Sequence, residues 1–132
     1  MICLLLVAVL TVLINPRSPV SMEALDEELV VQGSSGGAVR ITYSEIQYAE
    51  LRESLDYGVV VRGEDGKRER SGIWKNEEFG EYQLCVDAKI KSCIVLHMKS
   101  GIQVVNIESD QSTASLYDAI LKRADLVEQT ER

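Results

Sequence analysis

The sequence predicts a mainly β domain of about seven antiparallel strands that ends in one α-helix. Short runs such as residues 39–42 and 81–87 alternate apolar and polar side chains, which is the period of a half-buried strand. Glycine-rich or polar clusters at residues 33–37 and 99–101 separate these runs, as turns do. After residue 109 the apolar spacing changes to three and four residues, which is typical of an amphipathic helix. Together these patterns predict an antiparallel β-barrel or two-sheet sandwich capped by a C-terminal helix.

An uncharged apolar run extends from Ile2 to Ile14 at the start of the chain. As a helix it would rise about 20 Å, short of the roughly 30 Å hydrocarbon core of a bilayer. We expect residues 1–14 to form a short hydrophobic membrane helix, or the end of a longer one that Met1 truncates. A signal-peptide core and a buried element of the domain remain alternatives, although the run lacks preceding basic residues and any periodicity.

Residues 15–27 are expected to form a linker, because Pro16 and Pro19 stop a helix there. Arg17 is the only charged residue among the first 22. Under the positive-inside rule this arginine favours a cytoplasmic position for the domain that follows. We therefore expect a membrane-associated protein whose domain lies on the cytoplasmic side.

The predicted domain spans residues 28–128 and is followed by a tail at residues 129–132. Alternating or β-branched runs predict its strands, in chain order, over residues 29–31, 39–42, 46–51, 70–74, 81–87, 92–98 and 102–106. Val59 to Val61 adds a short strand or an edge within a polar stretch. Tight turns join the last strands, so we expect a meander of hairpins there.

The C-terminal segment predicts a helix of about four to five turns. Ser109 or Asp110 can cap its first turn, because a side-chain oxygen satisfies backbone N–H groups that lack a partner within the helix. One face of this helix is apolar and consists of Leu116, Tyr117, Ile120, Leu121, Ala124 and Val127. We expect this face to pack onto the sheet.

The chain is acidic, since 14 Lys and Arg stand against 21 Asp and Glu and give a net charge of −7. Such a chain is repelled by phosphate backbones and by anionic lipid headgroups. We therefore expect no nucleic-acid partner. One stretch is locally basic and contains Arg62, Lys67, Arg68 and Arg70, interleaved with Glu64, Asp65 and Glu69. Interleaved charges are typical of a solvated loop or edge strand, and an anion or partner contact through the four basic side chains is the alternative.

No catalytic, cofactor-binding or metal-binding set of residues is visible, and we expect neither an enzyme nor a cofactor. His97 is the single histidine; a pair with Cys93 or Cys85 is conceivable, but a structural histidine is favoured because no further catalytic group accompanies it. The loop Gly33–Gly37 lacks the lysine and the following helix of a phosphate-binding loop, so it predicts a flexible hairpin turn. The acidic clusters at residues 23–28 and 77–78 lack the spaced oxygen ligands and glycine of a calcium loop.

The stretch from Leu29 to Leu121 resembles the bacterial pleckstrin-homology (PH) domain families. Val39–Ile46 (VRITYSEI) is similar to a strand, a Tyr-Ser-acidic-Ile turn and the start of the next strand in those families. Ser71–Trp74 (SGIW) and Phe79–Val86 (FGEYQLCV) are similar to a later block. The resemblance implies a PH-like fold, a terminal capping helix and, as in many members, one or more preceding hydrophobic helices.

Lipid-binding relatives of the PH domain grip inositol phosphates with a basic first hairpin loop. The corresponding loop here is Gly33–Gly37, and Arg40 is its only nearby cation. We therefore do not expect phosphoinositide binding.

These observations favour a non-enzymatic, membrane-tethered, PH-like interaction or scaffold module. Its partner would be another protein or a second copy of the chain, and its membrane contact would be the run Ile2–Ile14. A small-ligand or lipid-binding module that uses the mouth of the barrel is the alternative. An enzyme is a third hypothesis, which the residues support least.

The cysteines give a prediction about redox state and geometry. We expect Cys85 and Cys93 to lie on neighbouring strands of one hairpin with both side chains on the same face, yet to remain free thiols, because a cytoplasmic domain is kept reduced. Thiol titration of the unfolded, unreduced protein should then find three reactive groups, Cys3 included. A single reactive group would indicate a Cys85–Cys93 disulfide and would place the domain outside the membrane.

Overall fold

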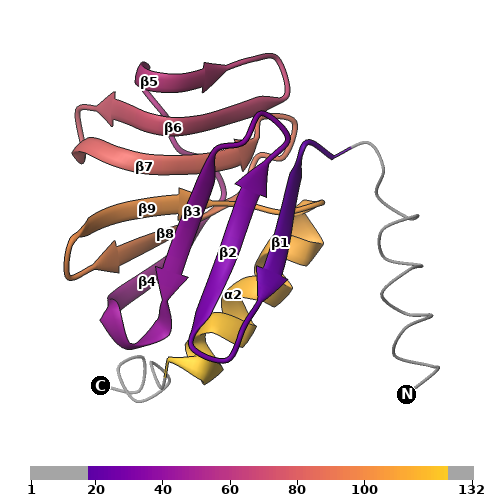
Figure 1. Cartoon of the computed structure of the whole chain (residues 1–132), viewed down its shortest axis with the longest axis vertical. Helices are drawn as coiled ribbons and strands as arrows, with labels where there is room; N and C mark the ends of the chain where they lie inside the picture. The colour runs from indigo at the N-terminus through magenta and orange to yellow at the C-terminus, as the bar shows by residue number, and fades with distance from the viewer. Residues whose placement is uncertain (1–17, 125–132) are drawn as a thin grey trace.

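A computed structural model describes residues 18–124 and contains, within them, nine strands and one C-terminal helix (Figure 1). The elements are β1 (Val20–Ala24), β2 (Glu28–Gly33), β3 (Ala38–Thr42), the 3-10 turn η1 (Tyr43–Glu45), β4 (Ile46–Arg52), β5 (Val59–Asp65), β6 (Glu69–Asn76), β7 (Gly80–Asp87), β8 (Cys93–Met98), β9 (Gly101–Val105) and α2 (Asp110–Arg123). The predicted mainly β fold with one C-terminal helix is confirmed.

The first three strands form a small antiparallel sheet with β2 in its centre. Three consecutive apolar residues of β2, Leu29 to Val31, are buried. Strand β1 lies within residues 15–27, which the sequence analysis assigned to a linker. Val20 is the one buried residue of β1, at 2% exposure, so the strand carries no periodic signal that could reveal it.

The other six strands form a large sheet in the order β4-β8-β9-β7-β6-β5. Strand β9 folds back on β8 and inserts between β8 and β7, where it runs parallel to β7. The predicted meander of hairpins is therefore wrong at this point, because β7 and β8 are not neighbours. The two sheets are also not closed into a barrel, so the two-sheet arrangement is present and the barrel is not.

The end of β9 is held by Asn106, whose side chain is fully buried. Its Oδ1 accepts a hydrogen bond from the backbone N of Asp87 at 2.7 Å, and its Nδ2 donates to the carbonyls of Asp87 at 3.1 Å and Ser92 at 3.2 Å. One amide thus joins the end of β7, the connection to β8 and the end of β9. A buried amide with all these bonds specifies its neighbours, because any other register would leave polar groups unpaired.

One face of the large sheet is covered by two different elements. The small sheet lies over β6, β7 and β9, whereas α2 lies against β4 and β8. The first core cluster fills the space between them and consists of Val20, Leu29, Val31, Val39, Ile41, Ile46, Ala49, Cys85, Ile94, Leu96, Met98, Val105, Ile107, Leu116 and Ile120.

The opposite face of the large sheet carries a second core cluster, formed by Tyr57, Trp74, Tyr82, Leu84, Val86, Cys93, Val95 and Val104. It is covered by residues 53–58, which connect β4 to β5 although these strands lie at opposite edges of the sheet. The Tyr82 hydroxyl donates to the Tyr57 carbonyl at 2.7 Å, and Asn76 Nδ2 donates to the Asp56 carbonyl at 2.9 Å. These bonds hold the crossing segment against the sheet.

The expected position of the two cysteines on one face is wrong. Cys85 belongs to the first core cluster and Cys93 to the second, so their side chains lie on opposite faces, with β9 between their strands. Both are buried free thiols, as expected. Burial raises the pKa of Cys85 to about 12 and that of Cys93 to about 11. Cys3 lies outside the described residues.

Helix α2 begins as the sequence predicts. Ser109 is its N-cap, and Ser109 Oγ accepts a hydrogen bond from the backbone N of Ser112 at 3.0 Å. Leu116 and Ile120 are buried, and Leu121 packs at the margin of the first core cluster. The apolar face therefore packs onto the sheet as expected; Val127 lies outside the described residues.

The predicted membrane segment at residues 1–14 and the tail at residues 129–132 also lie outside the described residues. Within residues 18–124, no helix is both long and apolar enough to cross a bilayer.

The packing of α2 gives a stability prediction. Ile120 is 1% exposed in the first core cluster, so Ile120→Ala should lower the free energy of unfolding by about 2–5 kcal/mol in a denaturant titration, because it leaves a cavity. Lys122→Ala, on the exposed side of the same helix, should change it by less than about 0.5 kcal/mol. Equal effects of the two substitutions would contradict this packing.

Candidate functional site

The four basic residues singled out from the sequence do not converge on one site. Arg62 on β5 and Lys67 in the following turn are exposed. Arg68 pairs with Asp87, whereas Arg70 Nε lies 3.8 Å from Asp65 Oδ1. Arg70 Nε is nevertheless buried without a hydrogen-bond partner among the described residues.

The pair of Arg68 and Asp87 has a structural explanation. Arg68 Nε and Nη2 donate to the two carboxylate oxygens of Asp87 at 3.1 and 2.8 Å, and the backbone N of Lys89 donates to the same carboxylate at 3.0 Å. Burial raises the pKa of Asp87, but the hydrogen bonds from Arg68 and Lys89 lower it by a larger amount. The pKa of Asp87 is therefore below its ordinary value. The guanidinium of Arg68 therefore already binds a carboxylate of its own chain.

The loop Gly33–Gly37 is the hairpin turn that the sequence predicts, but it is held in place by Glu69 of β6. Ser34 Oγ and the backbone N of Ser35 donate to Glu69 Oε1, each at 3.0 Å. Ser35 Oγ donates to Glu69 Oε2, as does Ser71 Oγ at 2.7 Å. A Cβ atom at Gly33 would lie 2.2 Å from Glu69 Oε2, so a side chain at this position would displace the Glu69 carboxylate. The polar donors of the loop therefore already bind an anion, the carboxylate of Glu69.

Sequence reasoning placed Glu69 in a solvated stretch, whereas the structure buries it at 6% exposure. Burial raises the pKa of Glu69, but the hydrogen bonds from Ser35, Ser71 and Ser34 lower it by a larger amount. The pKa of Glu69 therefore lies below its ordinary value. In the structure Glu69 and Ser71 are buried on β6 while Arg70 between them is half-buried, so the two residues share an inward face, and the only corresponding signal in the sequence is their spacing of two residues.

His97 does not form the conceivable pair with either cysteine. Its Nε2 lies 2.8 Å from Glu50 Oε2 across β4 and β8. Arg52 Nη2 donates to the same Glu50 oxygen at 3.2 Å, and Arg52 also donates to both carboxylate oxygens of Glu78 at 2.7 and 2.6 Å. Burial raises the pKa of Glu50, yet its bonds to His97 and Arg52 lower it more, so the net shift is downward.

Aromatic contacts surround this charged group. The Phe79 ring lies 5.5 Å from that of Tyr82 and 6.4 Å from that of His97, both edge-on, and the Arg52 guanidinium lies 5.5 Å from the Phe79 centroid. The cluster therefore fastens β4 and β8 to the β6–β7 turn over the second core cluster. We interpret His97 as a structural histidine, and its carboxylate and arginine partners were missed because they are distant in sequence.

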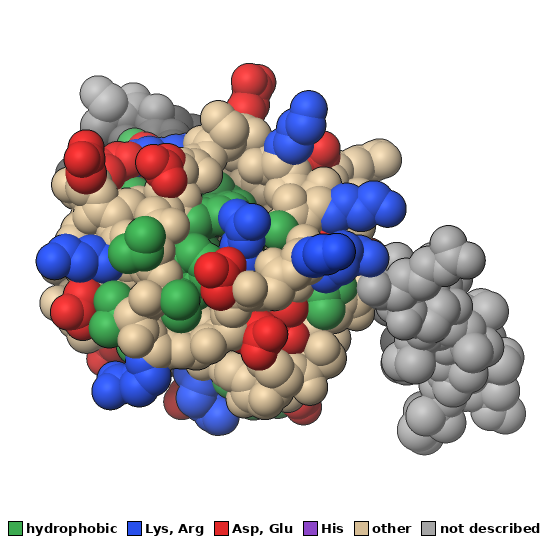
Figure 2. All heavy atoms as spheres, turned by 90° about the horizontal axis from the view of Figure 1, so that it is seen from above, with side chains coloured by type: hydrophobic (Ala, Val, Ile, Leu, Met, Phe, Trp, Pro, Cys, Tyr) green, Lys and Arg blue, Asp and Glu red, His purple; other side chains and the backbone are tan. Residues whose placement is uncertain are grey.

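The edge of the large sheet at β5 presents apolar side chains to solvent. Val59 is 65% and Val61 is 49% exposed, whereas Val60 between them packs against the second core cluster. Within residues 18–124, β5 pairs with β6 alone, and a bulge interrupts this pairing between Val60 and Arg62. Figure 2 looks down on the end where β5 lies in Figure 1, and hydrophobic side chains emerge there among interspersed acidic and basic ones. The predicted edge at residues 59–61 is thus confirmed.

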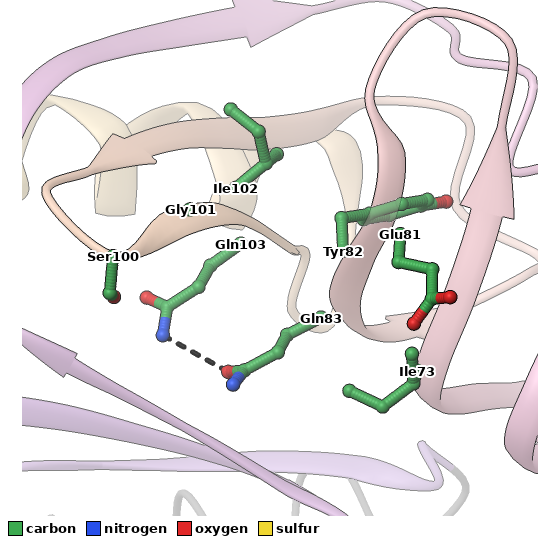
Figure 3. A pocket seen from close by; sticks show the side chains of 8 residues that line it. All are labelled: Ile73, Glu81, Tyr82, Gln83, Ser100, Gly101, Ile102 and Gln103. Carbon is green, nitrogen blue, oxygen red and sulfur yellow. Dashed lines mark hydrogen bonds between the residues drawn. The ribbon is translucent and has the colours of Figure 1, made fainter.

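A pocket of about 160 Å³ lies on the same sheet, where β7 and β9 run side by side (Figure 3). Its lining includes Ile73 of β6, Glu81 and Gln83 of β7, Ser100 of the β8–β9 turn and Gln103 of β9. Gln103 Nε2 donates to the Gln83 Oε1 at 3.1 Å and to the Arg40 carbonyl of β3 at 3.0 Å. The pocket therefore opens beside the junction of the two sheets.

No group of three or more His, Cys, Asp or Glu side chains that could hold a metal ion occurs in the described part of the chain. Comparison of the whole chain with protein-family models, curated proteins and solved structures found no match in any of the three.

The position of Glu69 predicts a pH-dependent contribution to stability. Glu69→Gln removes acceptor capacity from a cage of N–H and O–H donors, so it should lower the free energy of unfolding by about 1–3 kcal/mol at pH 7. Because the pKa of Glu69 is lowered by folding, its stabilisation is complete above the unfolded pKa and is lost as the pH falls through the folded pKa.

The difference between wild type and Glu69→Gln should therefore shrink in denaturant titrations taken from pH 7 down to about pH 2. Glu81→Gln, an exposed glutamate on β7, serves as the matched control and should show little difference at any pH. A Glu69→Gln difference that grows toward acid would refute the ionised cage.

Proposed function

We propose that this chain is a non-enzymatic, membrane-tethered interaction module that presents the β5 edge to another protein or to a second copy of itself. The observation that carries the proposal is the exposure of Val59 and Val61 on a strand that, within residues 18–124, pairs on one side only. An edge strand offers unpaired backbone N–H and C=O groups, to which an extended segment can add as a further strand.

The side chains of β5 suit this mode of binding. Soluble proteins usually protect such edges with charges, proline or a covering element. Here the first three residues of the strand are valines, and its charges follow only from Arg62 onward. A partner strand would form backbone hydrogen bonds with β5 and would bury the side chains of Val59 and Val61, which are now exposed to solvent.

The groups with catalytic chemistry support a non-enzymatic role. Burial raises the pKa values of Cys85 and Cys93 well above neutrality, so neither is a ready thiolate. His97 and Glu50 lie close together, but Arg52 holds that carboxylate in the ionic cluster that fastens the sheet. The two buried thiols and the His97–Glu50 pair therefore have structural roles.

The run Ile2–Ile14 is the proposed membrane tether, on the strength of its composition. A distant relationship to the PH-domain families is our family hypothesis, and the order of strands followed by one C-terminal helix favours it. The parallel pairing of β7 with β9 counts against it, since the PH-like prediction called for a mainly antiparallel β-barrel or two-sheet sandwich.

A small-ligand or lipid-binding module is the second candidate. Three surface pockets of about 430, 450 and 520 Å³, which lie beside Tyr43, Leu116 and Leu25, are the observation in its favour, because they fall within the roughly 300–1,000 Å³ of pockets that enclose a drug-sized ligand. The pocket beside Gln103, at about 160 Å³, is smaller than that range. This size favours the capture of one side chain over the enclosure of a whole small molecule or acyl chain.

The β5 proposal predicts loss of association after two surface substitutions. A photo-crosslinking residue at Glu64 of the full-length chain in membranes should give adducts whose mass identifies a second copy or another protein. Val59→Lys with Val61→Lys should reduce these adducts at least about fivefold, because charge on an edge strand opposes strand addition. Both valines are exposed, so thermal unfolding should change little.

The matched control is Tyr48→Lys with Leu51→Lys, which changes exposed apolar residues at the opposite edge, on β4. This variant should retain the adducts. Unchanged crosslinking in the β5 variant, or loss confined to the β4 variant, would show that β5 is not the docking edge.

A further inference from the structure

We propose that the pocket beside Gln103 binds the guanidinium of an arginine side chain from the partner protein. The inference deepens the proposed function and rests on it in one respect, that the partner is a protein. The arginine would donate hydrogen bonds to Gln103 Oε1 and to the Glu81 carboxylate.

The first argument is an incomplete hydrogen-bond set at Gln103. The residue is 8% exposed, and its Nε2 group makes two hydrogen bonds, to the Arg40 carbonyl and to Gln83 Oε1. Its Oε1 atom is buried and has no partner within the part of the chain that the structure describes. A buried carbonyl oxygen without a donor is unfavourable, so a ligand that brings an N–H group gains more here than at an exposed amide.

The second argument is the character of the pocket around that oxygen. Figure 3 shows Gln103, Gln83 and Glu81 extending from β9 and β7 on the same side of the sheet, with Ser100 beside Gln103 and Ile73 next to Glu81. Glu81 contributes a carboxylate and Ser100 a hydroxyl, while Ile73 contributes an apolar wall. The Glu81 carboxylate and Gln103 Oε1 are acceptors, and Gln83 Nε2 is the amide donor beside them, so the pocket suits a ligand that donates several hydrogen bonds and carries an aliphatic stem.

Arginine fits this description better than lysine. Its planar guanidinium has N–H donors that point in several directions, so it can reach acceptors on two strands, whereas an ammonium group is a compact and strongly hydrated charge. The net charge of −7 also attracts a basic partner. Lys75 stands opposite Glu81 in the β6–β7 register, yet the ion pairs among residues 18–124 do not include these two.

The distance from β5 decides which part of the partner supplies the arginine. With strands about 4.8 Å apart, a strand added to β5 would lie roughly 14 Å from β7 and farther from β9. An arginine on the added strand cannot span that distance. The arginine therefore belongs to a neighbouring loop or segment of the partner that lies over the face of the sheet.

The test uses saturation-transfer NMR on the full-length chain in nanodiscs of uncharged lipid. The probes are the blocked peptides acetyl-Gly-Arg-Gly-amide and its citrulline analogue, which is neutral but of similar shape, together with free L-arginine. We expect the arginine peptide to bind roughly tenfold more tightly than the citrulline peptide, since a charged hydrogen bond is lost. Equal binding of both peptides, or tighter binding of free L-arginine, overturns the proposal.

Substitutions then locate the binding. Gln103→Leu should weaken the arginine peptide roughly tenfold and Glu81→Gln roughly threefold, whereas Gln47→Leu, at an exposed glutamine on β4, should have no effect. If Gln103→Leu does not fold, the exposed Glu81→Gln decides. Val59→Lys with Val61→Lys should leave peptide binding intact. Peptide affinity that is unchanged by both Gln103→Leu and Glu81→Gln overturns the proposed arginine site. The β5 crosslinks test the proposed function separately.

Discussion

The segment of residues 53–58 must join two strands that lie at opposite edges of a six-stranded sheet. Five strand spacings in a flat sheet amount to about 24 Å, and the seven steps from Arg52 to Val59 reach about 24 Å only when fully extended. The connection therefore crosses the face of the sheet, and the sheet curves around it. This one constraint creates the second core cluster, brings Arg52 to Glu78 and leaves β5 as an edge strand within the described part of the chain.

Buried polar groups give the arrangement its specificity. Glu69 fastens the small sheet to β6, and Asn106 fastens β9 between its neighbours, each through several hydrogen bonds from its own chain. Apolar contacts alone would tolerate a slipped strand more readily, because they have no direction. A shift in strand register at Glu69 or Asn106 would instead leave buried hydrogen-bond donors or acceptors without partners.

The same plan explains where a partner can bind. The small sheet lies over β6, β7 and β9 and α2 lies against β4 and β8, so the two divide one face of the large sheet between them. The pocket lies beside the junction of the two sheets, where the amide nitrogen of Gln103 binds the Arg40 carbonyl while its buried oxygen has no hydrogen-bond partner among residues 18–124. Under the two proposals above, the partner would be a protein with an extended segment for the β5 edge and an arginine for the pocket.

The sequence by itself determined the elements whose signals are local: alternating strands, glycine turns, the Ser109 cap, the amphipathic helix and the edge at Val59–Val61. These depend on periodicity and on capping groups a few residues away. Strand β1, the insertion of β9, the opposite faces of Cys85 and Cys93, the burial of Glu69 and the pairing of His97 with Glu50 were decided only by the tertiary structure. Each depends on which distant segments meet, and a period along the chain is the same whichever neighbour a strand acquires.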